Sequence, residues 1–234
     1  MEVVIVGGPH SGVGKTLAAE VALRALDGLG YGAIKLTVAD GERDPEHDHG
    51  SSALSVAHAA GICGRGASCG VCETVSGKLP SRLIVSEGAI HKRGTDTWRL
   101  ANAGAVAVAW IIALREAAPA AVEAAMRHLE SKGASGVVIE GTTALDWLVP
   151  RASVIVATDP GRKWKDVALR HVGDCDIVLR NTPPVPSGDL ATPVAFAAAS
   201  PRVCDLGRFD EPGTQWYAAR LRELCAPFSV RANS

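Results

Sequence analysis

The sequence predicts an α/β fold in which a mostly parallel sheet is flanked by helices in a three-layer arrangement. Short apolar runs rich in β-branched residues alternate with helical stretches along most of the 234 residues. Such runs are typical of strands buried on both faces and joined by right-handed crossovers. Hydrophobic residues make up 47% of the chain but aromatic residues only 4%, which favours helices packed closely on a sheet. The length fits a single domain spanning residues 1–234.

The predicted sheet begins at the N-terminus. Residues 2–6 form a strand that stops at two glycines, and residues 16–29 form the first helix. A second strand is expected at residues 32–36. Residues 40–80 are rich in Gly, His, Asp and Cys and have little periodicity beyond a short helical stretch at 51–60. Because loops this long are uncommon in compact domains, we interpret this stretch as an insertion into the domain and not as a second domain.

Regular alternation resumes after the insertion. Strands are expected at residues 83–86, 105–113, 136–140, 153–157 and 176–179. Helices are expected at residues 96–104, 119–132, 162–172 and 213–225. The proline at the start of the second of these helices is typical of a first helical turn.

A glycine-rich segment joins the first strand to the first helix. It reads Gly-Pro-His-Ser-Gly-Val-Gly-Lys-Thr over residues 8–16. In such a turn successive backbone N–H groups point at phosphate oxygens, and the helix N-terminus adds partial positive charge. Lys15 would reach the β and γ phosphates and the Thr16 hydroxyl would bind Mg²⁺, although a simple helix-capping turn is the alternative. The residues predicted to bind ATP or GTP are Gly8, Ser11, Gly12, Val13, Gly14, Lys15 and Thr16.

Two polar residues follow later strands of the predicted sheet. Glu140 ends a buried strand, where ligands of open α/β sheets bind, and it is the candidate magnesium-side carboxylate. The alternative is that Glu140 ends its strand in solvent. Asn181 follows another strand and precedes two prolines. Its amide would either contact a nucleobase edge or serve only the local turn.

The charge balance limits the possible partners. With 24 basic and 25 acidic groups the net charge is −1, which gives no general attraction to nucleic acids or acidic membranes. Any bound phosphate must therefore be held locally. No apolar run approaches the roughly 18 residues of a membrane span, and the N-terminus does not resemble a secretory signal. We therefore expect a cytoplasmic protein whose cysteines are thiols or metal ligands and not disulfides.

Three cysteines of the insertion have the spacing of metal ligands. Cys69 and Cys72 lie two residues apart among glycines and can turn toward one metal ion, with Cys63 as a third ligand. The candidates for a fourth ligand are His47, His49, His58, His91 and a residue of a second subunit. Zinc and an iron–sulfur cluster both suit this set. A redox-active dithiol and unligated loop cysteines remain alternatives.

Several of these motifs together resemble a branch of the P-loop NTPases. The loop ending Ser-Gly-Val-Gly-Lys-Thr, Lys35 on the second strand, the Glu140-Gly141 pair and Asn181 before two prolines resemble dethiobiotin synthetase and the MobB proteins of molybdopterin-guanine dinucleotide biosynthesis. Residues 93–99 read Arg-Gly-Thr-Asp-Thr-Trp-Arg, followed by Ala-Gly-Ala, and are similar to the Gly-Lys-Asp-Ser-Trp-Arg segment of MobB. The resemblance covers residues 3–160 apart from the insertion.

The chain departs from the family pattern at three places. Pro9 and Thr95 stand where the family tends to have glycine and lysine. The insertion is also far longer than the loop that such proteins usually have there.

The resemblance implies roles for individual residues. Lys15 and Thr16 would hold phosphate and Mg²⁺, Glu140 would be the metal-side carboxylate, and Lys35 and Asp96 would line the same cleft. MobB-like proteins bind GTP, are usually dimeric and are thought to help a partner enzyme attach a nucleotide to molybdopterin. The resemblance therefore implies a homodimeric accessory factor in metallocofactor assembly with slow NTP hydrolysis, in which Lys15, Lys35 and Glu140 are the catalytic candidates.

Two other functions remain open. In a ligase resembling dethiobiotin synthetase, Lys35 would neutralise a substrate carboxylate that receives the γ-phosphate of ATP. In a metal or iron–sulfur carrier, the cysteine insertion would hold the cargo and the nucleotide state would control its release.

Overall fold

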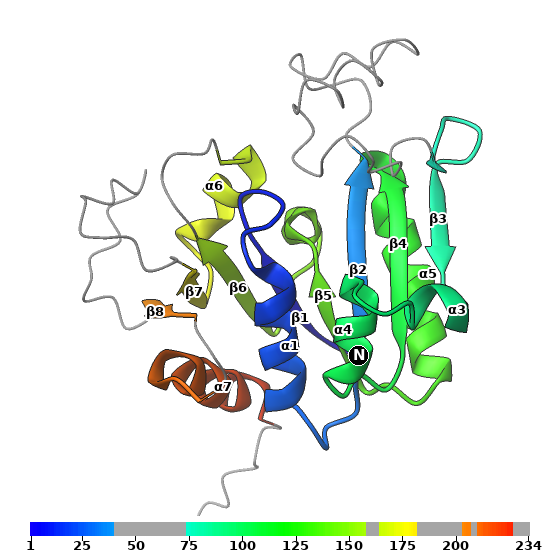
Figure 1. Cartoon of the computed structure of the whole chain (residues 1–234). Coiled ribbons are helices and arrows are strands. Elements are labelled where there is room, and N and C mark those ends of the chain that lie inside the picture. Colours follow the sequence, from blue (N-terminus) through cyan, green and yellow to red (C-terminus); the bar gives the residue numbers. More distant parts are fainter. Residues whose placement is uncertain (40–73, 158–163, 182–202, 207–209, 227–234) are drawn as a thin grey trace, which may run out of the picture.

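The computed structural model describes residues 1–39, 74–157, 164–181, 203–206 and 210–226. Within these ranges eight strands form one sheet in the order β3-β4-β2-β5-β1-β6-β7-β8 (Figure 1). The strands are β1 (Glu2–Gly7), β2 (Tyr31–Ala39), β3 (Ser81–Ile84), β4 (Val108–Leu114), β5 (Gly136–Glu140), β6 (Ala152–Ala157), β7 (Ile177–Arg180) and β8 (Val203–Asp205). The helices are α1 (Lys15–Ala25), α3 (Glu87–Ile90), α4 (Asp96–Asn102), α5 (Ala118–Ser131), α6 (Asp166–Val172) and α7 (Pro212–Cys225), with 3₁₀ turns η2 (Arg115–Ala117) and η3 (Thr142–Asp146).

The strand directions confirm the predicted α/β class and mostly parallel sheet. Among the described strands, every pair is parallel except β3 with β4. The carboxyl ends of the parallel strands therefore meet at one edge of the sheet, where the loop of residues 8–16 leaves β1 (Figure 1).

Alternating side chains of the strands build a core on each face of the sheet. Val4 and Val6 of β1 pack with α1, α4 and α7, whereas Ile5 packs on the other face with α5 and α6. Figure 1 shows α1, α4 and α7 in front of the sheet and α5 behind it. The arrangement is compatible with the predicted three layers.

Several predicted elements differ from the observed ones. The helix expected at residues 16–29 ends at Ala25, because Gly28 and Gly30 adopt positive φ values of 81° and 72° and turn the chain into β2. The strand expected at 83–86 occupies Ser81–Ile84 and runs antiparallel to β4. Strand β8 was not predicted. Helix α3 and the 3₁₀ turns η2 and η3 were not predicted either. The remaining described elements lie within a few residues of the expected positions.

Part of the prediction falls outside the described ranges, including the helical stretch at 51–60, most of the insertion and the start of the helix expected at 162–172. The described cysteines, Cys175, Cys204 and Cys225, are free thiols. None of the helices that the structure describes is long and apolar enough to cross a membrane.

Candidate functional site

A cleft of about 670 Å³ opens at the carboxyl edge of the sheet. Its walls come from the loop after β1, the end of β2, the start of α4 and the segment after β5. The predicted site residues that line it are Gly8, Ser11, Gly12, Gly14, Lys15, Thr16, Lys35, Asp96 and Glu140. Val13 of the loop is buried, 1% exposed, and Asn181 contacts the loop at the Val13 carbonyl. The structure thus brings the described candidates to one place.

The loop conformation depends on two glycines. Gly12 and Gly14 have φ values of 78° and 102°, in the left-handed region that favours glycine. A Cβ atom at Gly14 would also collide with Nδ2 of Asn181. Helix α1 starts directly after Gly14, and as a glycine this N-cap residue has no side chain to cap the first turn. Its first N–H groups are therefore available to an anion in the cleft.

Two side chains that follow strands β5 and β7 hold the loop in place. The Thr142 hydroxyl accepts a hydrogen bond from the Gly8 N–H at 2.8 Å and donates one to the Gly8 carbonyl at 2.7 Å. Asn181 Nδ2 donates to the Val13 carbonyl at 2.9 Å. The predicted contact of Asn181 with a nucleobase stays a prediction, because the described contact is with the loop itself.

Sequence reasoning missed Thr142. It lies two residues beyond the predicted carboxylate Glu140. Because β1 and β5 are neighbouring parallel strands, Thr142 comes to lie next to Gly8. The only available signal was a hydroxyl residue just past the end of a strand, which is common in any loop.

Replacing Thr142 with valine tests whether its two hydrogen bonds hold Gly8 in place. The change leaves a buried N–H and a buried carbonyl without their partner, so we expect the free energy of unfolding to fall by about 1–3 kcal/mol. Urea denaturation followed by circular dichroism measures the loss. Thr143→Val is the matched control, because the Thr143 hydroxyl has no hydrogen-bond partner within the described ranges. Equal losses of unfolding free energy in the two variants would contradict this role of the Thr142 hydroxyl.

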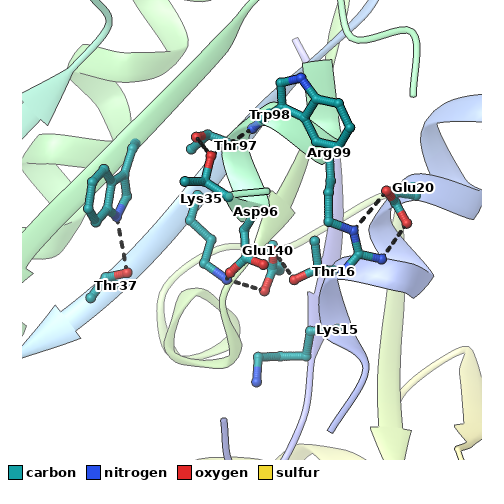
Figure 2. A network of polar contacts seen from close by, with 12 residues as sticks. Lys15, Thr16, Glu20, Lys35, Thr37, Asp96, Thr97, Trp98, Arg99 and Glu140 are labelled. Atoms are coloured by element: carbon teal, nitrogen blue, oxygen red, sulfur yellow. Dashed lines mark hydrogen bonds and ion pairs between the residues drawn. The ribbon is translucent and has the colours of Figure 1, made fainter. Parts of the chain in front are cut away.

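A charged network lies on the floor of the cleft. Lys35 and Glu140 are paired residues of the adjacent strands β2 and β5, so their side chains point to the same face of the sheet. The Lys35 ammonium contacts Glu140 Oε1 and lies 2.7 Å from Asp96 Oδ2. Thr16 Oγ1 donates a hydrogen bond of 3.1 Å to Glu140 Oε2 (Figure 2). Glu140 is only 2% exposed, so it does not end its strand in solvent.

Asp96 reaches this network from the first turn of α4. The Thr95 hydroxyl caps that helix by accepting a hydrogen bond from the Trp98 N–H at 3.3 Å. Burial acts to raise the pKa of Asp96, but the Lys35 ammonium 2.7 Å away outweighs it and holds the pKa below its usual value. Asp96 is therefore ionised at neutral pH and adds a second negative charge beside Lys35.

Helix α4 is fastened to α1 by an ion pair. Arg99 donates two hydrogen bonds to Glu20, with Nε at 3.0 Å and Nη2 at 2.6 Å (Figure 2). Such bidentate geometry fixes orientation as well as distance. The pair therefore keeps Asp96 of α4 close to Thr16 of α1.

The cleft has more positive than negative charge. Its described lining has five basic side chains and two carboxylates, while the whole chain has a net charge of −1. The basic side chains are Lys15, Lys35, Lys92, Arg99 and Lys165. Lys15 donates to the His10 carbonyl of its own loop at 2.6 Å. Phosphate binding stays a prediction, and in this cleft these cations would supply the local attraction that it requires.

The magnesium site stays a prediction, and its two candidate residues, Thr16 and Glu140, lie in hydrogen-bond contact. No group of three or more His, Cys, Asp or Glu side chains that could hold a metal ion occurs in the part of the chain that the structure describes. Magnesium usually takes one or two carboxylates together with substrate phosphates and waters, and Thr16 with Glu140 fits that pattern. Cys63, Cys69 and Cys72 lie outside the described residues, so their zinc or iron–sulfur site stays a prediction.

Comparisons with known proteins found no relative of this chain. No protein-family model matches the sequence, and neither a curated protein nor a solved structure matches the chain.

Proposed function

We propose that the chain is a P-loop NTPase that binds GTP or ATP with Mg²⁺ and hydrolyses it slowly. The observation that carries the proposal is the hydrogen bond between Thr16, in the helical turn after the glycine-rich loop, and the buried carboxylate of Glu140. A hydroxyl in this position donates its proton to the carboxylate in a hydrogen bond and keeps an oxygen lone pair for a metal ion. The positive lining of the cleft supports a polyanionic ligand.

Each residue of the cleft has a distinct task in this proposal. Thr16 and Glu140 would hold Mg²⁺, which would supply positive charge to neutralise the β and γ phosphates. Lys15 exchanges the His10 carbonyl for phosphate oxygens. The amides at the start of α1 bind phosphate oxygens, and Thr142 keeps the loop open by fixing Gly8.

The biological role that we propose is that of a MobB-like accessory factor, acting as a homodimer with a partner enzyme in molybdenum or related metallocofactor assembly. This part rests on the resemblance of the motifs around Lys15, Lys35, Asp96 and Glu140. Asp96 and Lys35 lie together in the cleft, which agrees with the roles that the resemblance implies for them.

One observation favours a second candidate. The Lys35 ammonium faces the cleft between two carboxylates, where it could also neutralise the carboxylate of a second substrate. An ATP-dependent ligase resembling dethiobiotin synthetase would use Lys35 in this way.

Titration with fluorescent GTP and ATP analogues, with and without Mg²⁺, tests the proposal. We expect saturable binding that weakens when EDTA removes the metal. Preference for GTP supports the MobB-like role, whereas equal or tighter ATP binding counts against it. ADP release that increases when a small diamine or carboxylate is added favours the ligase. Failure of both nucleotides to bind contradicts the proposal.

A further inference from the structure

We propose that the sheet edge formed by β3, with α3 and the turn after it, is a docking surface for an extended acidic strand of a partner protein. We call residues 76–94 the β3 edge surface. The inference rests on three features of the described residues: a strand edge with no further strand beside it, cations without a partner, and exposed aliphatic side chains. It does not depend on nucleotide binding.

The first observation is the open edge of the sheet. Among the described strands β3 is the last on its side, and β4 is its single neighbour. Arg82 and Leu83 in the middle of β3 are exposed. A strand in this position presents backbone N–H and C=O groups that can pair with another chain.

The second observation is unbalanced positive charge. Four exposed basic side chains of the β3 edge surface have no ion pair or hydrogen bond within the described structure: Lys78, Arg82, Lys92 and Arg93. The single acidic residue of this surface, Glu87, lies 3.1 Å from His91. Most other described arginines contact a carboxylate, as Arg99 contacts Glu20. Charge complementarity therefore favours an acidic partner.

The third observation is exposed aliphatic surface beside these charges. Leu79, Leu83 and Val85 are 42%, 38% and 36% exposed. Aliphatic side chains next to a free strand edge suit a protein strand with alternating apolar and acidic residues. Single-stranded nucleic acid would instead call for aromatic stacking platforms, and the sequence of residues 76–94 contains no aromatic residue. A second copy of the chain would bring like charges together.

The location gives the surface a connection to the cleft. Ala89 and Lys92 belong to the β3 edge surface and also line the cleft. Thr95, which caps α4 and so positions Asp96, follows directly. A partner strand on β3 would therefore lie at the rim of the cleft.

A short peptide of alternating glutamate and valine is the probe for the full chain at low salt. We expect it to bind, to slow hydrogen exchange of the β3 amides, and to lose about tenfold or more in affinity for the variant Arg82→Glu/Arg93→Glu. The matched control is Arg127→Glu/Arg220→Glu, which changes the net charge equally at positions of α5 and α7 outside the β3 edge surface. Circular dichroism and urea denaturation check that both variants fold.

Three comparison ligands distinguish strand pairing from charge attraction alone, and a protein partner from nucleic acid or a membrane. A peptide methylated at alternate backbone nitrogens retains the charge but cannot pair with a strand, and we expect it to bind at least about tenfold more weakly. An oligothymidylate and phosphatidylserine vesicles should bind less tightly than the acidic peptide.

The proposal is overturned if the charge-reversal variant binds the peptide as the wild type does, if the methylated peptide binds equally well, or if the oligonucleotide or the vesicles bind more tightly. It is also overturned if the wild-type chain binds no acidic peptide, or if β3 becomes protected only on self-association.

Discussion

Lys15→Ala is expected to lower the affinity for the magnesium complexes of GTP and ATP by about a hundredfold or more. Lys15 is the lysine of the glycine-rich loop and lines the cleft beside Thr16. Hydrogen bonds to charged groups contribute about 1.5–3 kcal/mol each, so the loss of contacts to two phosphates amounts to roughly two powers of ten. Isothermal titration calorimetry measures the change.

The control for this variant is Lys132→Ala, which removes an exposed lysine that follows α5. It should bind nucleotide like the wild type. Circular dichroism of both variants checks the fold. If Lys15→Ala is folded and binds with wild-type affinity, the loop does not hold the phosphates in the way we propose.

Glu140→Gln is expected to reduce the rate of hydrolysis by about a hundredfold and to shift the magnesium dependence to higher concentration. The substitution keeps the shape of the side chain, and glutamine can still accept the hydrogen bond from Thr16. It removes the buried negative charge that would hold the metal, and the loss of one electrostatic group at a reacting centre typically costs about 10²–10³ in rate. Phosphate release measured over a range of Mg²⁺ concentrations tests this.

Glu130→Gln on the exposed surface of α5 is the matched control. It makes the same chemical change away from the cleft and should leave both the rate and the magnesium dependence unchanged. A Glu140→Gln variant with wild-type magnesium dependence would remove Glu140 from the proposed metal site.

The parts of the site that could be predicted are those with a local sequence signal. The bounds of β5 were predicted at residues 136–140 because an apolar β-branched run ends abruptly at a carboxylate, and these bounds are confirmed. Lys35 and Glu140 were both expected in the cleft, and the register of β2 with β5 explains why they meet.

The parts that could not be predicted depend on contacts between distant residues. Thr142 has no motif of its own, because its role arises only when β1 and β5 pair and bring Gly8 within reach. The antiparallel direction of β3 is likewise set by its pairing with β4 after the insertion. The bidentate contact of Arg99 with Glu20 joins two helices whose packing the periodicity alone does not specify.

The central claim is that the amides between Gly8 and Thr16 bind phosphate, and NMR of ¹⁵N-labelled protein tests it most directly. On addition of a non-hydrolysable triphosphate analogue with Mg²⁺, the account predicts large downfield shifts for the amide protons of Gly14, Lys15 and Thr16, with small changes at remote positions such as the end of α5. Unchanged loop amides at saturating analogue, or shifts confined to another part of the molecule, would contradict it.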